Sequence, residues 1–215
     1  MLQISIGYQN TPLYKDIKIE LPEHGIISVL GHNGCGKSTF YKTLLGIIAP
    51  VSGEIPTQIS GRIALVSDYI HIPEEVSVRD VFDLLGPDKI NYAKEKYNKF
   101  HQIISSYETQ SIETLSSGQR RMVEIYAVLA SGKTVVILDE ASNSLDYDNQ
   151  RLLISQVKEL SEDILFFHTT HKLEEAAYLK GEIYGLFKDD GEMRKFQKEY
   201  SLENIREFLG YQWAE

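Results

Sequence analysis

The chain has a single cysteine, Cys35, among its 215 residues. One cysteine excludes a disulfide within the chain and fits a protein that works in a reducing compartment. The sequence also lacks any apolar run near the roughly 18 residues that a membrane-spanning helix needs. Its first residues have neither the basic segment nor the apolar segment of a signal peptide. We therefore expect a cytoplasmic protein, for which any role at a membrane comes through a partner.

Basic residues are in short supply as well. Lys and Arg number 22 against 31 Asp and Glu, which gives a formal net charge of -9. Nonspecific binding to DNA or RNA relies on an excess of positive charge, so we expect no nucleic-acid partner. This balance does not exclude ATP, because phosphates are bound locally by backbone N–H groups and one lysine.

Short apolar strands alternate with helical patterns through much of the chain. Residues 26–30, 134–138 and 164–167 are the expected core strands, and residues 37–48 and 149–160 are expected helices. This alternation predicts an α/β fold with a mainly parallel sheet and helices on both of its faces.

Three other regions depart from this alternation. Residues 2–8 and 13–21 alternate apolar and polar side chains and predict paired strands of an N-terminal antiparallel β subdomain. Residues 78–107 lose their β-branched runs and predict a helical lobe inserted in the core. Residues 183–187 and 192–196 predict a hairpin. A length of 215 residues suits one domain with such an insertion.

A phosphate-binding loop follows the first core strand. Gly31-x4-Gly36-Lys37-Ser38 lies between a predicted strand and a predicted helix, the context that distinguishes this motif from an ordinary glycine-rich turn. Its N–H groups would meet phosphate at a helix N-terminus, with Lys37 on the β- and γ-phosphates, Ser38 on Mg²⁺ and Thr39 on the α-phosphate. The predicted ATP-binding loop consists of Gly31, His32, Asn33, Gly34, Cys35, Gly36, Lys37, Ser38 and Thr39.

Cys35 within this loop has two interpretations. The favoured one is a small residue that fills space. The other is a reactive thiol, whose pKa the helix N-terminus lowers.

Two carboxylates end the apolar strand of residues 134–138. Asp139 and Glu140 would lie at a strand tip beside the phosphate loop. We expect Asp139 to hold Mg²⁺ through a water and Glu140 to act as the general base on the attacking water. The alternative is a solvated acidic strand end.

Between the phosphate loop and the acidic strand end lies the sequence Leu115-Ser116-Ser117-Gly118-Gln119. Together, in this order, the three motifs resemble the ATP-binding cassette (ABC) ATPase family, and the resemblance covers nearly the whole chain. The resemblance implies a head-to-tail dimer, in which residues 115–119 are the signature sequence and contact the ATP bound by the other subunit. Ser117 stands where the family usually has glycine, and Ser116 is a plausible helix N-cap. The implied contacts across the dimer come from Leu115, Ser116, Ser117, Gly118 and Gln119.

The resemblance also implies roles for single residues. His171 would contact the γ-phosphate, whereas His168 is expected to be structural. Tyr8 would stack on adenine. Asp68 stands where the family usually has a glutamine, and we expect it to serve as a Mg²⁺ ligand in its place. The implied dimer-contact loop contains Ser144, Leu145 and Asp146.

The resemblance predicts the nucleotide-binding subunit of a transporter, with ATP and Mg²⁺ as cofactors. Residues 1–215 would form one ABC ATPase domain, with residues 69–130 as its helical subdomain. It would dimerise with itself or a homologous cassette and act on a separate membrane subunit from the cytoplasmic face. That partner would dock near residues 68–83, where Tyr69, Ile70 and Ile72 could contact it or pack internally. Two alternatives are a soluble ATPase of metal-cluster assembly and a low-activity regulatory cassette.

Overall fold

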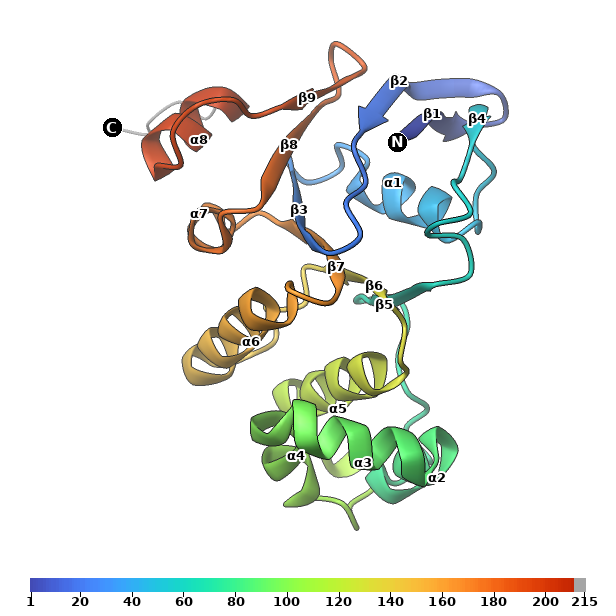
Figure 1. Cartoon of the computed structure of the whole chain (residues 1–215), viewed down its shortest axis with the longest axis vertical. Coiled ribbons are helices and arrows are strands. Elements are labelled where there is room, and N and C mark those ends of the chain that lie inside the picture. Colours follow the sequence, from blue (N-terminus) through green and yellow to red (C-terminus); the bar gives the residue numbers. More distant parts are fainter. Residues whose placement is uncertain (211–215) are drawn as a thin grey trace.

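The computed structural model describes residues 1–210, which form two sheets and two groups of helices (Figure 1). Residues 211–215 of the predicted domain lie outside the described part. Within residues 1–210, six strands form the main sheet in the order β5-β6-β7-β3-β8-β9, all parallel except β9. Its strands are β3 (Gly25–Leu30), β5 (Ile63–Val66), β6 (Val135–Asp139), β7 (Leu165–Thr170), β8 (Glu182–Phe187) and β9 (Glu192–Lys195).

The smaller sheet is antiparallel and has the order β2-β1-β4. It consists of β1 (Leu2–Tyr8), β2 (Thr11–Ile19) and β4 (Ser52–Glu54). The pairing of the first two strands was predicted, although β2 begins and ends two residues before the expected range of 13–21. The parallel core, this N-terminal sheet and the helical lobe described next confirm the predicted fold class.

Four helices lie next to the main sheet: α1 (Lys37–Leu44), α6 (Tyr147–Leu160), α7 (Leu173–Leu179) and α8 (Leu202–Leu209). Helix α1 stops short of the predicted residue 48 because Leu45 caps it and Gly46 turns the backbone to φ 74°. Helix α6 starts at Tyr147 instead of 149 because the Asp146 side chain accepts a hydrogen bond from the Asn149 N–H, 2.9 Å away.

The remaining helices gather at the lower end of the molecule in Figure 1. They are α2 (Val78–Leu85), α3 (Pro87–Lys96), α4 (Asn98–Ser105) and α5 (Ser117–Ala130), with a 3₁₀ turn at Ile112–Thr114. The helical pattern of residues 78–107 thus divides into three helices. Gly86, with φ 85° before Pro87, separates the first two, and Tyr97 separates the next two.

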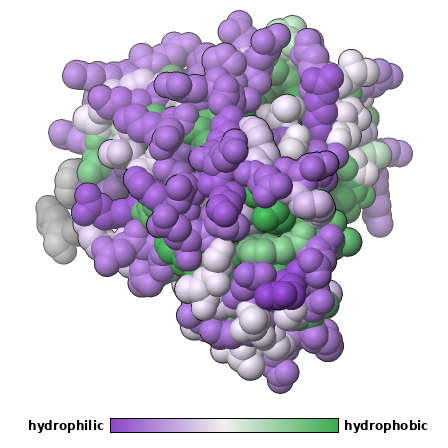
Figure 2. Space-filling model, turned by 60° about the horizontal axis from the view of Figure 1, so that its bottom comes forward, coloured by the Kyte–Doolittle hydropathy of each residue, from purple (hydrophilic) through white to green (hydrophobic). Residues whose placement is uncertain are grey.

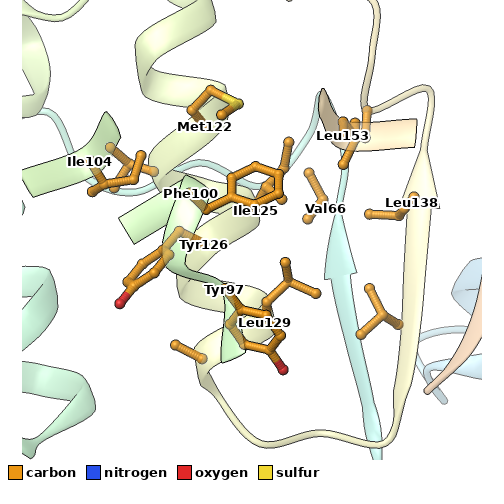
Figure 3. Close-up of a cluster of buried hydrophobic side chains, with 14 of the residues drawn as sticks. Val66, Tyr97, Phe100, Ile104, Met122, Ile125, Tyr126, Leu129, Leu138 and Leu153 are labelled. Atoms are coloured by element: carbon orange, nitrogen blue, oxygen red, sulfur yellow. The ribbon is translucent and has the colours of Figure 1, made fainter. Parts of the chain in front are cut away.

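Alternate residues of the main sheet face opposite layers, as strand geometry requires. Ile137 and Phe167 pack with α1 and the smaller sheet. Val136 and Phe166 pack on the other face with α6 and the lower helices. Figure 3 shows how this second cluster joins Tyr97, Phe100, Ile104, Met122, Ile125, Tyr126 and Leu129 to Val66, Leu138 and Leu153. The lower helices are therefore fixed to the sheet through apolar contacts with β5, β6 and α6.

Among residues 1–210, no helix combines the length and the apolar character that crossing a bilayer requires. The face shown in Figure 2 is largely hydrophilic, with hydrophobic residues breaking the surface between the lower helices and the rest of the molecule. Exposed hydrophobic side chains in the segment from β5 to α2 are Tyr69, Ile70 and Leu84.

Candidate active site

The loop between β3 and α1 has a shape that depends on glycine. Gly34 has φ 75° and Gly36, the residue before α1, has φ 112°, both in the left-handed region. A Cβ atom on Gly36 would come within 2.7 Å of the Leu13 side chain. The Tyr14 hydroxyl of the smaller sheet donates a hydrogen bond to the Cys35 carbonyl. The N-terminal sheet therefore supports the predicted phosphate loop from behind.

Lys37 links this loop to the acidic strand tip. The side chain is only 7% exposed, and its Nζ atom donates to the Gly31 carbonyl at 2.9 Å and lies 3.4 Å from the carbonyl of His32. The same Nζ is 3.6 Å from Oε1 of Glu140. A buried ammonium requires polar partners, and here they come from the two segments that were predicted to meet.

Asp139 and Glu140 end β6 beside the end of β7. Asp139 is buried and accepts a hydrogen bond from the Thr169 hydroxyl. Burial raises the pKa of the Asp139 carboxyl above its ordinary value. A cation beside it would favour its charged form.

Glu140 is held in an unusual backbone conformation. Its φ of 49° lies in the left-handed region, which non-glycine residues seldom adopt, and its N–H donates to the Thr169 carbonyl at 2.9 Å. Its Oε2 accepts from Nδ2 of Asn143 at 2.7 Å and lies 3.2 Å from Nδ1 of His171. The structure thus brings together Lys37, Glu140 and His171, which are far apart in the sequence.

Lys37 and Glu140 border a hollow of about 410 Å³, and His171 lies beside Glu140 outside its lining. Its lining is formed by Asn33, Gly34, Gly36, Lys37, Ser38, Thr39, Asp68, Tyr69, Asp139 and Glu140. All of these except Tyr69 were predicted site residues. Such a concave site with convergent polar groups is typical of a ligand pocket.

The hollow suits a metal ion that arrives with phosphate. The described residues contain no cluster of three His, Cys, Asp or Glu side chains that would hold a metal without help. Mg²⁺ commonly takes only one or two carboxylates together with phosphate oxygens and waters. Ser38 and Asp139 supply a hydroxyl and a carboxylate to the same hollow. The donors present therefore fit Mg²⁺ bound to a nucleotide.

Tyr8 lies at the end of β1, next to the phosphate loop. Its hydroxyl is 3.1 Å from the Thr39 hydroxyl, and the residue is 56% exposed. Stacking on adenine stays a prediction.

The signature residues begin α5 and are not in the lining of the phosphate-loop hollow. Ser116 is the N-cap, as predicted, and it forms a capping box with Gln119: the Gln119 N–H donates to Ser116 Oγ at 3.2 Å, and the Ser116 N–H donates to Gln119 Oε1 at 2.9 Å. Leu115 is buried. Gly118 packs so closely on the predicted dimer-contact loop that a Cβ atom would lie 3.1 Å from the Ser144 carbonyl oxygen.

In the dimer-contact loop itself, Leu145 is buried and Asp146 caps α6. Ser144 is the residue of the three that lies nearest the signature, as the contact with Gly118 indicates.

Asp68 has a partner that the sequence did not indicate. Its carboxylate pairs with Arg121 of α5, and Arg121 is buried. Arg121 and Glu124 stand three residues apart on α5, and both are buried. Two opposite charges at this spacing among apolar residues were the available signal. The Asp68 carboxylate lines the hollow but is already paired.

A second polar cluster was also missed. Glu175 is buried, and its carboxylate accepts from the Ser142 hydroxyl at 2.6 Å and the Thr170 hydroxyl at 3.0 Å. Nε2 of His168 lies 3.1 Å from the same carboxylate, so the structural role expected for His168 is confirmed.

The reactive interpretation of Cys35 is wrong. Cys35 is buried, and burial raises the pKa of its thiol despite the nearby Lys37. A Cβ atom on Gly31 would lie 2.6 Å from its sulfur, so the thiol fills the space beneath the loop.

Comparison with known proteins finds a matching family model, related sequences and similar solved structures. The family model described as "ABC transporter" matches residues 14–143. An uncharacterized ABC transporter ATP-binding protein of Haemophilus influenzae is 29% identical, with 94% of this chain and 85% of that protein covered. The energy-coupling factor transporter ATP-binding protein EcfA2 of Clostridium tetani is 28% identical, with coverages of 92% and 80%. The solved structure of cbiO1 from Clostridium perfringens, part of the ABC transporter complex cbiONQ, is similar in fold, with a TM-score of 0.70, 20% identity and coverages of 89% and 84%.

Proposed function

Because the chain belongs to the ABC transporter family and is an ATP-binding ATPase of that family, we propose that it is the stand-alone nucleotide-binding subunit of a membrane transporter. In this proposal, ATP joins two subunits head to tail, and hydrolysis drives transport through a separate membrane subunit. The observation that carries the proposal is the convergence of Lys37, Glu140 and His171 beside the phosphate loop.

Residues in and beside the hollow have separate roles in binding ATP. Residues 31–39 bind the phosphates through N–H groups and Lys37, and Tyr8 stacks on adenine. Ser38 and Asp139 would hold Mg²⁺, and a bound Mg²⁺ would supply positive charge to offset the charge that develops on the transferred phosphoryl group. Asp68 is a third candidate ligand, and its ion pair with Arg121 must open before it can turn to the metal.

Glu140 and His171 act on the attacking water and the γ-phosphate. Asn143 and His171 both approach Oε2 of Glu140, whereas Oε1 is the oxygen nearer to Lys37. Glu140 is therefore oriented as a general base, with His171 placed to contact the γ-phosphate.

The start of α5 supports the head-to-tail dimer. Its capping box uses the N–H groups of Ser116 and Gln119, and none of the described contacts uses those of Ser117 and Gly118. Unpaired N–H groups at a helix N-terminus attract anions. We assign them to the γ-phosphate held by the other subunit, with residues 144–146 at the same interface.

The membrane partner and the domain organisation complete the proposal. Residues 1–215 form one ATPase domain, with residues 69–130 as its helical subdomain. Tyr69 and Ile70 are 69% and 53% exposed and suit an apolar docking surface, whereas Ile72 packs internally. The subunit would work on the cytoplasmic face of the membrane.

The experiment that tests this function is ATP hydrolysis by the Glu140→Gln variant. Removing a general base should lower the rate about 10²–10⁴-fold while ATP binding is kept. ATP should then convert this variant from monomer to a stable dimer, as measured by gel filtration with light scattering.

Two variants serve as controls. Lys37→Ala should lose ATP binding, and Glu174→Gln, which changes an exposed glutamate, should hydrolyse ATP normally. A Glu140→Gln rate equal to that of the wild type would rule out the general-base role. That conclusion requires a wild-type rate above the background of Lys37→Ala. A wild type that binds ATP but hydrolyses it no faster than Lys37→Ala would favour a regulatory cassette, which Ser117 and the Asp68–Arg121 pair suggest.

A further inference from the structure

Arg121 is a buried arginine that joins three segments of the chain. Its side chain is 4% exposed. Nη1 donates to the Ser67 carbonyl at 2.9 Å and to Glu124 at 3.0 Å, Nη2 contacts the Asp68 carboxylate, and Nε is 3.4 Å from Oγ of Ser144. A buried guanidinium is stable only when it is paired. Its contacts therefore tie the loop after β5, helix α5 and the loop after β6 together.

Asp68 stands on the wall between two hollows. One is the phosphate-loop hollow, where Asp139 and Glu140 also lie. The other has a volume of about 360 Å³ and is lined by Asp68, Arg121 and Ser117 among others. The Asp68 side chain is 54% exposed, although its carboxylate is paired with Arg121. A third unneutralised carboxylate in the phosphate-loop hollow would repel a polyphosphate.

Arg121 remains neutralised when Asp68 moves, because Glu124 is its second carboxylate partner. Glu124 is itself held from the other side: its Oε1 lies 2.8 Å from Nδ1 of His71, and Nε2 of His71 lies 3.0 Å from the Asp68 carbonyl oxygen. Arg121 and Glu124 thus form a buried pair, and Asp68 is the exposed carboxylate of the cluster. The ion pair between Asp68 and Arg121 is called the latch below.

We propose that Arg121 is a positioning residue that holds Asp68 against α5 and offsets its charge, so that nucleotide affinity at the phosphate loop depends on this ion pair. The inference rests on the proposed ATP site. The ion pair between Asp68 and Arg121 would then connect the loop after β5 to the helix that begins at the signature. Arg121 acts through Asp68 and does not touch the nucleotide.

The test is equilibrium binding of ATP without Mg²⁺, measured by isothermal titration calorimetry on six proteins. The proteins have one of three residues at position 121 (the native Arg121, Arg121→Lys or Arg121→Gln). Each of these is prepared in two backgrounds, one with the native Asp68 and one with Asp68→Asn. With Asp68 present, Arg121→Gln should weaken ATP binding about 5–10-fold, because the carboxylate is left unneutralised, and Arg121→Lys should weaken it less, because the charge is kept. With Asp68→Asn, the differences among the three proteins should become smaller, because Arg121→Gln then leaves only Glu124 without its guanidinium partner.

This design separates positioning from a structural role. If Arg121 only supports the fold, its substitutions should weaken ATP binding by the same factor in both backgrounds, and that result would overturn the proposal. Thermal unfolding of each variant shows whether it is folded at the assay temperature. If wild type binds no ATP, the proposed function fails; if wild type binds ATP but the two backgrounds behave alike, only the latch fails.

A second measurement does not depend on the folding of Arg121 variants. Asp68 is largely exposed, so Asp68→Asn should fold normally. In the nucleotide-free protein, opening the latch should speed amide hydrogen exchange in residues 68–71, measured by mass spectrometry. Exchange in this segment that is unchanged in Asp68→Asn would contradict the proposal.

Discussion

At the scale of single residues, Glu175 is the centre of a buried polar cluster beside the site. Its carboxylate accepts from Ser142 and Thr170, contacts His168 and lies 3.7 Å from Nζ of Lys172. Lys172 also reaches Oγ of Ser142 at 3.1 Å. Because His171 lies between Thr170 and Lys172, this cluster fixes the segment that presents His171 to Glu140.

The pKa of Glu175 gives the cluster a pH dependence. Burial works to raise this pKa, but the hydrogen bond and charge of His168 and the hydrogen bond from Ser142 outweigh it, so the pKa lies below its ordinary value of 4.5. A lowered carboxylate pKa stabilises the fold above the ordinary value, and this contribution is lost as pH falls through the lowered value. We predict that Glu175→Gln lowers the free energy of unfolding by about 1–3 kcal/mol at neutral pH. The difference from wild type should shrink below pH 4.5, as measured by urea unfolding across pH.

Glu174→Gln is the matched control for this prediction. The neighbouring Glu174 side chain is 64% exposed, and its ion pair with Arg206 is long, at 3.8 Å. Because exposed ion pairs contribute little to stability, Glu174→Gln should change the free energy of unfolding little at any pH. A Glu175→Gln penalty that stays constant down to acid pH would contradict the assigned cause.

At the scale of elements, α2 and α5 begin with the same device. Ser77 and Asp80 form a capping box at the start of α2, as Ser116 and Gln119 do at α5. The two helices therefore share a local cause of stability. They differ in the proposed role of their N-termini, since only α5 is expected to meet ATP.

This pair permits a test that separates capping from binding. Ser116→Ala and Ser77→Ala should each lower the free energy of unfolding by about 1 kcal/mol, because each loses its N-cap hydrogen bond. Only Ser116→Ala should also weaken ATP-dependent dimerisation, as measured by light scattering in the Glu140→Gln background. Equal dimerisation by the two variants would remove Ser116 from the interface.

The same local rules explain how much of the fold was visible in the sequence. The phosphate loop, the cap at Ser116 and the carboxylates at the end of β6 depend on neighbours within a few residues, so their patterns could be recognised directly. Strand β4 could not be predicted from the sequence, because the three residues of Ser52–Glu54 are all exposed and show no apolar alternation. This strand pairs with β1 through its backbone. The strand order of the main sheet could not either, because its buried strands have similar apolar patterns.

The missed parts of the site have the same physical origin. Arg121 and Asp68 are 53 residues apart, and their contact exists only once α5 packs beside β5. Glu175 likewise gathers donors from the loop after β6 and from β7. Such pairs depend on how helices and strands pack in space, and the periodicity of apolar residues along the sequence does not indicate this packing.

At the scale of the whole molecule, the two halves of the proposed ATP site belong to different parts of one chain. The phosphate loop leads from β3 into α1 beside the smaller sheet, whereas α5 belongs to the lower group of helices (Figure 1). In a head-to-tail dimer, each subunit would therefore give one half to each of the two sites.

Mixing two defective subunits tests this arrangement. In the Glu140→Gln background, Lys37→Ala should lose the phosphate-loop half, and Ser116→Glu should lose the signature half by repelling the γ-phosphate. Neither should dimerise alone with ATP. An equimolar mixture should form mixed dimers in which one of the two sites is intact, so about half of the sites of the parent protein should retain ATP.

Retained radiolabelled ATP per subunit measures this recovery. A mixture of two separately prepared Lys37→Ala samples is the control and should retain none. If the mixture of the two different variants also retains none, ATP is not shared between the phosphate loop of one subunit and the signature of the other.

The burial of Cys35 beneath the phosphate loop makes this protein a convenient subject for spectroscopy. The only thiol of the chain is shielded by the fold, so a cysteine introduced at an exposed position is the one that a maleimide probe can reach. Spin labels or fluorophores can therefore be attached without first replacing Cys35 and disturbing the loop. The distance between labelled subunits during an ATP cycle is then open to measurement in a protein whose nucleotide loop is unaltered.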